Sequence, residues 1–137
     1  MTDPKPPVTA ELTWSEDLRF DVRSGKTAFV IDSSSTAGPS PVQLLAVSLA
    51  GCMAMDVVDI LRRGRHELTA FQATITGHRT PDPPRRLTAV HLQFAMHGAV
   101  PQSAVERAIE LSRDKYCSVW HSMRQDIGLT TGFDIQP

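Results

Sequence analysis

Alternating apolar and polar residues predict three short β-strands near the start of the chain. Residues 9–15, 18–23 and 26–32 carry this alternation or a short apolar run, and Ser24-Gly25 marks the turn before the third segment. Short strands joined by tight turns are typical of an antiparallel meander. The preceding residues 1–8 are polar and rich in proline, which predicts a disordered lead-in to a single domain covering residues 9–137.

A long apolar helix is predicted next. In the tetrad Ser40-Pro41-Val42-Gln43, Ser40 can cap the helix, Pro41 suits its first position, and Gln43 can close a capping box. From there to about Arg63, apolar residues cover most of the helical circumference. A helix that is apolar nearly all round is buried on several sides, so we expect a long, buried central helix.

The second half of the chain predicts two long strands, two helices and a closing strand. The expected ranges are 67–80 and 86–97 for the strands, 101–116 and 117–125 for the helices, and 127–135 for the last strand. The resulting order is β-β-β-α-β-β-α-α-β. Strands grouped on either side of a long helix favour an α+β fold over alternating βαβ units.

The bulk composition mainly excludes certain classes of partner and location. With 137 residues and a formal charge of -1, the chain gives no electrostatic reason to expect nucleic acid or an anionic membrane as a partner. The longest nearly uncharged apolar run, Val42–Met55, is shorter than the roughly 18 residues of a membrane-spanning helix. No targeting segment is visible either. We therefore expect a soluble, cytoplasmic protein.

Cys52 is the first candidate for chemistry, and it lies mid-helix beside Gly51. A free cysteine is usually an inert, buried hydrophobe. Glycine inside a helix costs about 1 kcal/mol, which indicates either close access beside the sulfur or tight helix packing at this point. Asp56 and Asp59 follow on roughly the same face, where their charge would raise the pKa of the thiol. Activation would then need a cation from elsewhere, and Arg19 and Arg23 are candidates unless both are ordinary solvated arginines.

Cys117 is the second candidate. It opens the short predicted helix, where the helix dipole and Lys115 offer a route to a lowered thiol pKa. His121 follows four residues later on the same side. The alternative is simple core packing with Tyr116 and Trp120. Two cysteines are too few for a disulfide framework, so a role for both thiols would be chemical.

Metal binding and hydrolysis receive little support from residue spacing. No Cys-x-x-Cys or His-x-x-x-His pair occurs, so the sequence predicts no metal site. The five histidines fall on different predicted elements: His66, His78, His91, His97 and His121. A Cys117–His121 nucleophile pair is conceivable, but no third, orienting residue suggests itself.

Several stretches of the sequence resemble the OsmC/Ohr family. They are Gly38-Pro39-Ser40-Pro41-Val42-Gln43-Leu44-Leu45 running into Leu49-Ala50-Gly51-Cys52, then Asp56-Val57-Val58-Asp59-Ile60-Leu61, then Asp114-Lys115-Tyr116-Cys117-Ser118-Val119. The expected element order over residues 9–136 is also similar, so the resemblance covers nearly the whole chain. The Asp-Val-Val-Asp-Ile-Leu stretch looks closer to the OsmC-like branch than to the organic hydroperoxide resistance proteins.

The resemblance implies an intertwined homodimer whose two long central helices pack together, with each active site at the subunit interface. Cys52 would be the peroxidatic cysteine and Cys117 the resolving cysteine of a thiol-dependent peroxidase that reduces organic hydroperoxides. An external dithiol would reduce the resulting disulfide, so no cofactor is expected. Gln43 and Gly51 would be structural support.

The resemblance also implies an arginine held against the thiolate, and both Arg19 and Arg23 are candidates. Family members carry a glutamate soon after the proline that helps to hold this arginine. Here Val42 and Gln43 occupy those positions, which leaves no carboxylate there. Two other functions therefore stay open: a non-catalytic module that binds a small hydrophobic ligand at the dimer interface, and a redox-sensing interaction protein whose disulfide switches a partner surface.

Overall fold

A computed structural model describes residues 4–137. The chain divides into two compact units, one that ends at Leu45 and one that covers Ala46–Pro137. The predicted lead-in lies partly outside the described residues, and its described part, 4–8, is exposed and without regular secondary structure. A single domain over residues 9–137 stays a prediction.

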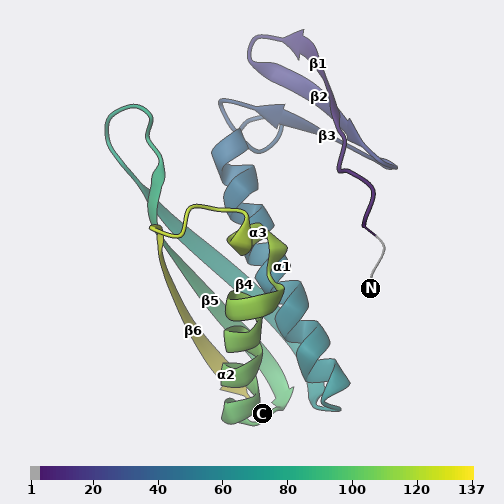
Figure 1. Cartoon of the computed structure of the whole chain (residues 1–137), viewed down its shortest axis with the longest axis vertical. Helices are drawn as coiled ribbons and strands as arrows, with labels where there is room; N and C mark the ends of the chain where they lie inside the picture. Colours follow the sequence, from purple (N-terminus) through teal and green to yellow (C-terminus); the bar gives the residue numbers. More distant parts are fainter. Residues whose placement is uncertain (1–3) are drawn as a thin grey trace. The chain divides into compact units, whose positions relative to one another are not determined.

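The first unit contains the predicted antiparallel meander. Its strands are β1 (Glu11–Glu16), β2 (Arg19–Ser24) and β3 (Thr27–Asp32), in the order β1-β2-β3 (Figure 1). The predicted turn at Ser24-Gly25 is confirmed, and Gly25 adopts a φ of 57°, which glycine tolerates without a steric penalty. In the loop that follows β3, Gly38 packs against the backbone of Val30, where a Cβ atom would overlap the carbonyl oxygen.

The long helix α1 (Pro41–Arg63) begins in the first unit and ends in the second. Its predicted capping box is confirmed: the Gln43 amide donates to Ser40 Oγ at 3.2 Å, and the Ser40 amide donates to Gln43 Oε1 at 3.0 Å. This pair satisfies two backbone N–H groups that the first turn leaves without helical partners.

Burial of α1 within one chain follows a single face. The buried residues are spaced four apart, at Leu49, Met53, Val57 and Leu61. Apolar residues on other faces remain open, with Val47 58% and Met55 74% exposed. An 18-residue window of α1 has a mean hydropathy of 2.0, so by length and composition alone the helix would also suit a membrane span.

The second unit places helices on one face of a three-stranded sheet. Strands β4 (Glu67–Arg79) and β5 (Leu87–Ala99) are antiparallel, and β6 (Gly128–Gln136) runs parallel to β5, which is the central strand. Alternate β5 residues are buried beneath α1 and α2 (Gln102–Leu111): Val90, Leu92, Phe94 and Met96 (Figure 1). The element order predicted from the sequence is confirmed, and the fold is α+β.

The helical segment after β5 differs from the prediction. Instead of helices over 101–116 and 117–125, α2 ends at Leu111, a π-helical turn η1 covers Ser112–Tyr116, and α3 is a single turn, Ser118–His121. The wider π turn closes with a 2.8 Å hydrogen bond from the Cys117 amide to the Ser112 carbonyl. It buries Ser112 and Cys117 together, although they are five residues apart.

Candidate functional site: a dithiol beside a carboxylate

The fold brings both cysteines of the chain together. Cys52 lies mid-way along α1, and Cys117 is the N-cap residue of α3. With Asp56, one turn after Cys52, they form a cluster in which the two sulfurs and a carboxylate oxygen all lie within 4.8 Å of one another. The cluster belongs entirely to the unit Ala46–Pro137. The predicted pairing of the two thiols in space therefore has a geometric basis.

Cys52 is the more accessible of the two thiols. Its side chain is half-buried, and its sulfur lies 3.9 Å from Ser118 Oγ. The neighbouring Gly51 is also half-buried, and a Cβ atom built there would meet nothing within 4 Å in this chain. Within this chain the helix therefore leaves open space at Gly51 and is not tightly packed there.

Cys117 is fully buried, and its thiol is hard to ionise. Burial is the main cause that raises its pKa from 9.0 to about 11. The Trp120 amide, which donates to Cys117 Sγ at 3.3 Å, acts in the opposite direction, and the neighbouring Cys52 and Asp56 act in the same direction as burial. The expectation of a lowered pKa at a helix start is wrong, because desolvation outweighs the contribution of a four-residue helix.

The other groups expected around Cys117 do not activate it. Lys115 is exposed, with its ammonium 5.2 Å from the centre of the Tyr116 ring. The His121 side chain is exposed while Cys117 is buried, so the exposure of the two residues gives no support to a Cys117–His121 nucleophile pair.

Asp56 and Asp59 have different surroundings. Asp56 is half-buried and accepts a 2.8 Å hydrogen bond at Oδ2 from the hydroxyl of the fully buried Ser112. Asp59 instead pairs with Arg63 at 2.9 Å on the exposed side of α1. Asp56 is therefore the carboxylate of the dithiol cluster, and Asp59 lies outside it. The predicted effect of the two carboxylates on Cys52 stays a prediction.

The difference between the two thiols predicts selective alkylation. At pH 7, iodoacetamide should modify Cys52 and leave Cys117 free, because a thiol with a pKa of about 11 is only about 10⁻⁴ ionised at that pH. Modification of Cys117 should rise only as the pH approaches 11. Peptide mass spectrometry of the labelled native protein checks this, with urea-unfolded protein as the control in which both thiols react. Equal labelling of both thiols in the native protein at pH 7 would contradict it.

The two candidate arginines lie on β2 in the first unit, and they differ in how they are held. Arg19 is half-buried, and its Nε donates to Asp32 Oδ2 at 3.2 Å. Arg23 is exposed and lines a shallow hollow that also includes Glu11 and Asp21. A role for either arginine toward Cys52 stays a prediction, but Arg19 is the one with a fixed guanidinium.

Asp32 is a buried carboxylate of the first unit that the sequence analysis did not single out. It is 3% exposed and accepts hydrogen bonds from the Ala37 and Ser34 amides, at 2.9 and 3.1 Å, and from the Ser34 hydroxyl. These bonds and the Arg19 guanidinium hold the pKa of the Asp32 carboxyl well below its usual range. Positions 42 and 43 carry no carboxylate, as the sequence shows, but Asp32 at the end of β3 contacts Arg19 instead.

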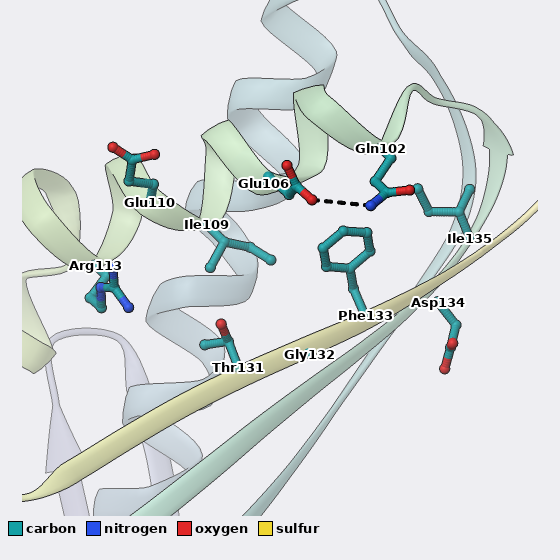
Figure 2. A pocket seen from close by; sticks show the side chains of 10 residues that line it. All are labelled: Gln102, Glu106, Ile109, Glu110, Arg113, Thr131, Gly132, Phe133, Asp134 and Ile135. Atoms are coloured by element: carbon teal, nitrogen blue, oxygen red, sulfur yellow. Dashed lines mark hydrogen bonds between the residues drawn. The ribbon is translucent and has the colours of Figure 1, made fainter.

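One hollow in the described part of the second unit includes a member of the dithiol cluster. It has a volume of about 450 Å³ and is lined by Asp56 together with Asp59, Ile60, Arg63, Leu111 and Tyr116. A larger groove of about 640 Å³ runs between α2 and β6 and includes no member of the cluster. Figure 2 shows its walls: Ile109 and Glu106 on α2 face Thr131 and Phe133 on β6, while the Asp134 side chain points away.

Comparison with known proteins agrees with this architecture. Residues 32–132 match the family model described as OsmC-like protein. The chain belongs to the OsmC-like family. It is 32% identical to protein YhfA of Escherichia coli over 129 residues, which covers 92% of this chain and 96% of that protein. Within this family, α1 is the core helix of a soluble protein, which accounts for its high hydropathy without a membrane.

Solved structures share the fold over almost the full length of the chain. A hypothetical protein from Aquifex aeolicus superposes with a TM-score of 0.89 at 25% identity, covering 96% of this chain and 98% of that one. An organic hydroperoxide resistance protein OsmC from Legionella pneumophila has a TM-score of 0.70 at 14% identity, covering 96% and 99%. The latter likeness shows a common fold alone.

Proposed function

We propose that this protein is a thiol-dependent peroxidase that reduces organic hydroperoxides through a Cys52–Cys117 disulfide. The observation that carries the proposal is the sulfur–sulfur separation of at most 4.8 Å, between a half-buried and a fully buried thiol. Some relatives with this fold are organic hydroperoxide resistance proteins. Formation of a disulfide from this arrangement requires the sulfurs to close to about 2.05 Å.

In the first step the Cys52 thiolate attacks one oxygen of the hydroperoxide. The O–O bond breaks, the sulfur is oxidised to a sulfenic acid, and the alkoxide leaves as an alcohol after taking up a proton. Cys52 suits this step because it is the more accessible member of the pair. Arg19 is the candidate to stabilise the thiolate and the developing charge on the leaving oxygen.

In the second step Cys117 attacks the Cys52 sulfenic acid. A disulfide forms, and the hydroxyl group leaves as water together with the thiol proton of Cys117. Because burial disfavours the Cys117 thiolate, this proton needs an acceptor close to the sulfur. Asp56 is the carboxylate within 4.8 Å, and the Ser112 hydroxyl fixes its orientation. We assign Asp56 the role of accepting this proton and passing it to the leaving hydroxyl group.

The cycle closes when an external dithiol reduces the disulfide by thiol–disulfide exchange and becomes a disulfide itself. The hollow lined by Asp56, Ile60, Leu111 and Tyr116 is the candidate approach for substrate and reductant. Its partly apolar wall favours an organic hydroperoxide over hydrogen peroxide. The proposed setting is the cytoplasm, where small and protein dithiols are available.

Steady-state kinetics test the proposed function. The reduced protein should consume cumene hydroperoxide with dihydrolipoamide as reductant, and do so faster than it consumes hydrogen peroxide. Equal rates on both peroxides would overturn the substrate preference. No consumption of either peroxide would overturn the peroxidase proposal and favour the ligand-binding module.

OsmC-like proteins are typically dimers, and we propose that this chain is a homodimer joined through the open apolar face of α1. Met55→Glu should dissociate the dimer, because burying an unpaired charge in an apolar interface costs several kcal/mol, roughly enough to offset micromolar association. Light scattering after size-exclusion chromatography measures the change, with Met55→Leu as the matched control that stays dimeric. A Met55→Glu protein of unchanged mass would show that the interface lies elsewhere.

A further inference from the structure

We propose that the reduced dithiol cluster is also a binding site for a thiophilic divalent cation, Zn²⁺, with Cys52 Sγ, Cys117 Sγ and an Asp56 carboxylate oxygen as ligands. The inference goes beyond the proposed peroxidase and does not depend on it, since it requires only that both thiols are reduced. Two sulfurs and one oxygen, each within 4.8 Å of the others, form a complete set of three protein ligands.

The distances suit tetrahedral zinc after a small contraction. Zn–S bonds of about 2.3 Å and tetrahedral angles hold two sulfur ligands about 3.8 Å apart, and a sulfur and a carboxylate oxygen about 3.6 Å apart. The distances between the ligand atoms, which are at most 4.8 Å, therefore have to shorten by up to about 1 Å when zinc binds. Rotation of the Cys52 and Asp56 side chains, both half-buried, is enough to supply a shift of this size.

The ligand chemistry selects the ion. Two thiolates favour Zn²⁺ over the hard cations Mg²⁺ and Ca²⁺, which take oxygen ligands. On binding, the two thiols release their protons, and the divalent ion offsets part of the negative charge that the three ligands then carry. The ion keeps a fourth position for water. The half-buried Cys52 lies on the side from which the ion and this water enter.

Surrounding groups support the ligands as in known zinc sites. The fully buried Ser112 hydroxyl donates to Asp56 Oδ2 at 2.8 Å, which orients the carboxylate, and hydrogen bonds of this kind tune metal affinity. The Trp120 amide donates to Cys117 Sγ at 3.3 Å, a contact that stabilises a sulfur ligand. Ser112 belongs to η1 and Trp120 to α3. The segment after α2 therefore supports ligands on α1 as well as its own Cys117.

The sequence predicted no metal site because it contains no metal-ligand spacing. Cys52 and Cys117 are 65 positions apart, and the fold rather than the spacing brings them together. Zinc binding and disulfide formation use the same two sulfurs, so they exclude each other. A zinc-loaded site is therefore a reduced state that is protected from oxidation.

Titration of the full-length, reduced protein with Co²⁺ tests the proposal. We expect a thiolate-to-cobalt charge-transfer band and the visible bands of tetrahedral Co²⁺, saturating at one ion per chain and abolished by Zn²⁺. Cys52→Ser and Cys117→Ser should lose the charge-transfer band, and Asp56→Asn should weaken binding at least about 10-fold. Asp59→Asn is the matched control on the same helix, since Asp59 pairs with Arg63 outside the cluster, and it should bind as the wild type does.

A second readout does not depend on variants that have to fold. Wild-type protein oxidised to the disulfide should bind no Co²⁺, and saturating Zn²⁺ should protect Cys52 of the reduced protein from iodoacetamide. Absence of the charge-transfer band in reduced wild type, an equal band in oxidised protein, or alkylation unaffected by Zn²⁺ would each overturn the proposal. None of these measurements uses a peroxide, so they separate failure of the metal site from failure of the peroxidase.

Discussion

Replacing Cys52 with serine should reduce hydroperoxide consumption to the uncatalysed rate. The serine hydroxyl is not ionised at neutral pH and is a far weaker nucleophile toward a peroxide oxygen than a thiolate. The same substitution removes one of the two sulfurs that lie within 4.8 Å, so no disulfide can form within the chain. The measurement is cumene hydroperoxide loss with dihydrolipoamide in excess.

Cys117→Ser should behave differently, and the contrast assigns the two roles. Cys52 can still attack one hydroperoxide, so a single turnover should leave a Cys52 sulfenic acid that dimedone traps. Multiple turnovers should slow strongly, since the buried resolving thiol is gone. If Cys117→Ser lost the first turnover while Cys52→Ser kept it, the assignment of peroxidatic and resolving cysteines would be reversed.

The second large effect is expected at Arg19. Removing one preorganised donor from a reacting centre costs about 10²-fold in rate, so Arg19→Ala should slow peroxide reduction by about that factor. Arg23→Ala is the matched control on the same strand, and as an exposed arginine it should change the rate by less than about 2-fold. Single-turnover kinetics of Cys52 oxidation measure both, independently of the reductant.

Asp32→Asn extends this test to the residue that holds Arg19. Asparagine keeps one acceptor oxygen but places an N–H₂ group where the Arg19 and Ala37 donors point. The rate of peroxide reduction by Asp32→Asn should fall, though by less than in Arg19→Ala. Arg19→Lys should also be slow, because lysine keeps the positive charge but lacks the planar guanidinium fork. Equal rates for Arg19→Ala and Arg23→Ala would remove Arg19 from the mechanism.

The elements with strong local signals could be predicted from the sequence. The Ser40 and Gln43 side chains satisfy amides that any helix beginning at Pro41 leaves open, so the start of α1 follows from local chemistry. The alternation along β5 likewise fixes which side chains are buried.

The sequence predictions that were wrong concern contacts between residues distant in the sequence, or a turn that has no recognisable sequence signal. The π turn of η1 contains no glycine or proline, yet it moves Cys117 out of the helix and into the core. The raised pKa of Cys117 follows from that burial and could not be derived from its helical position. The contacts Ser112–Asp56 and Asp32–Arg19 join side chains 56 and 13 positions apart. Neither spacing carries a motif.

The most direct test of the central claim is the fate of the two thiols after one equivalent of cumene hydroperoxide. Intact mass and non-reducing peptide mapping of the reduced wild-type protein should show loss of both thiol hydrogens and a Cys52–Cys117 linkage within one chain. Dihydrolipoamide should restore both thiols. Two unreacted thiols, or a disulfide that joins Cys52 or Cys117 to a different chain, would contradict the proposed cycle.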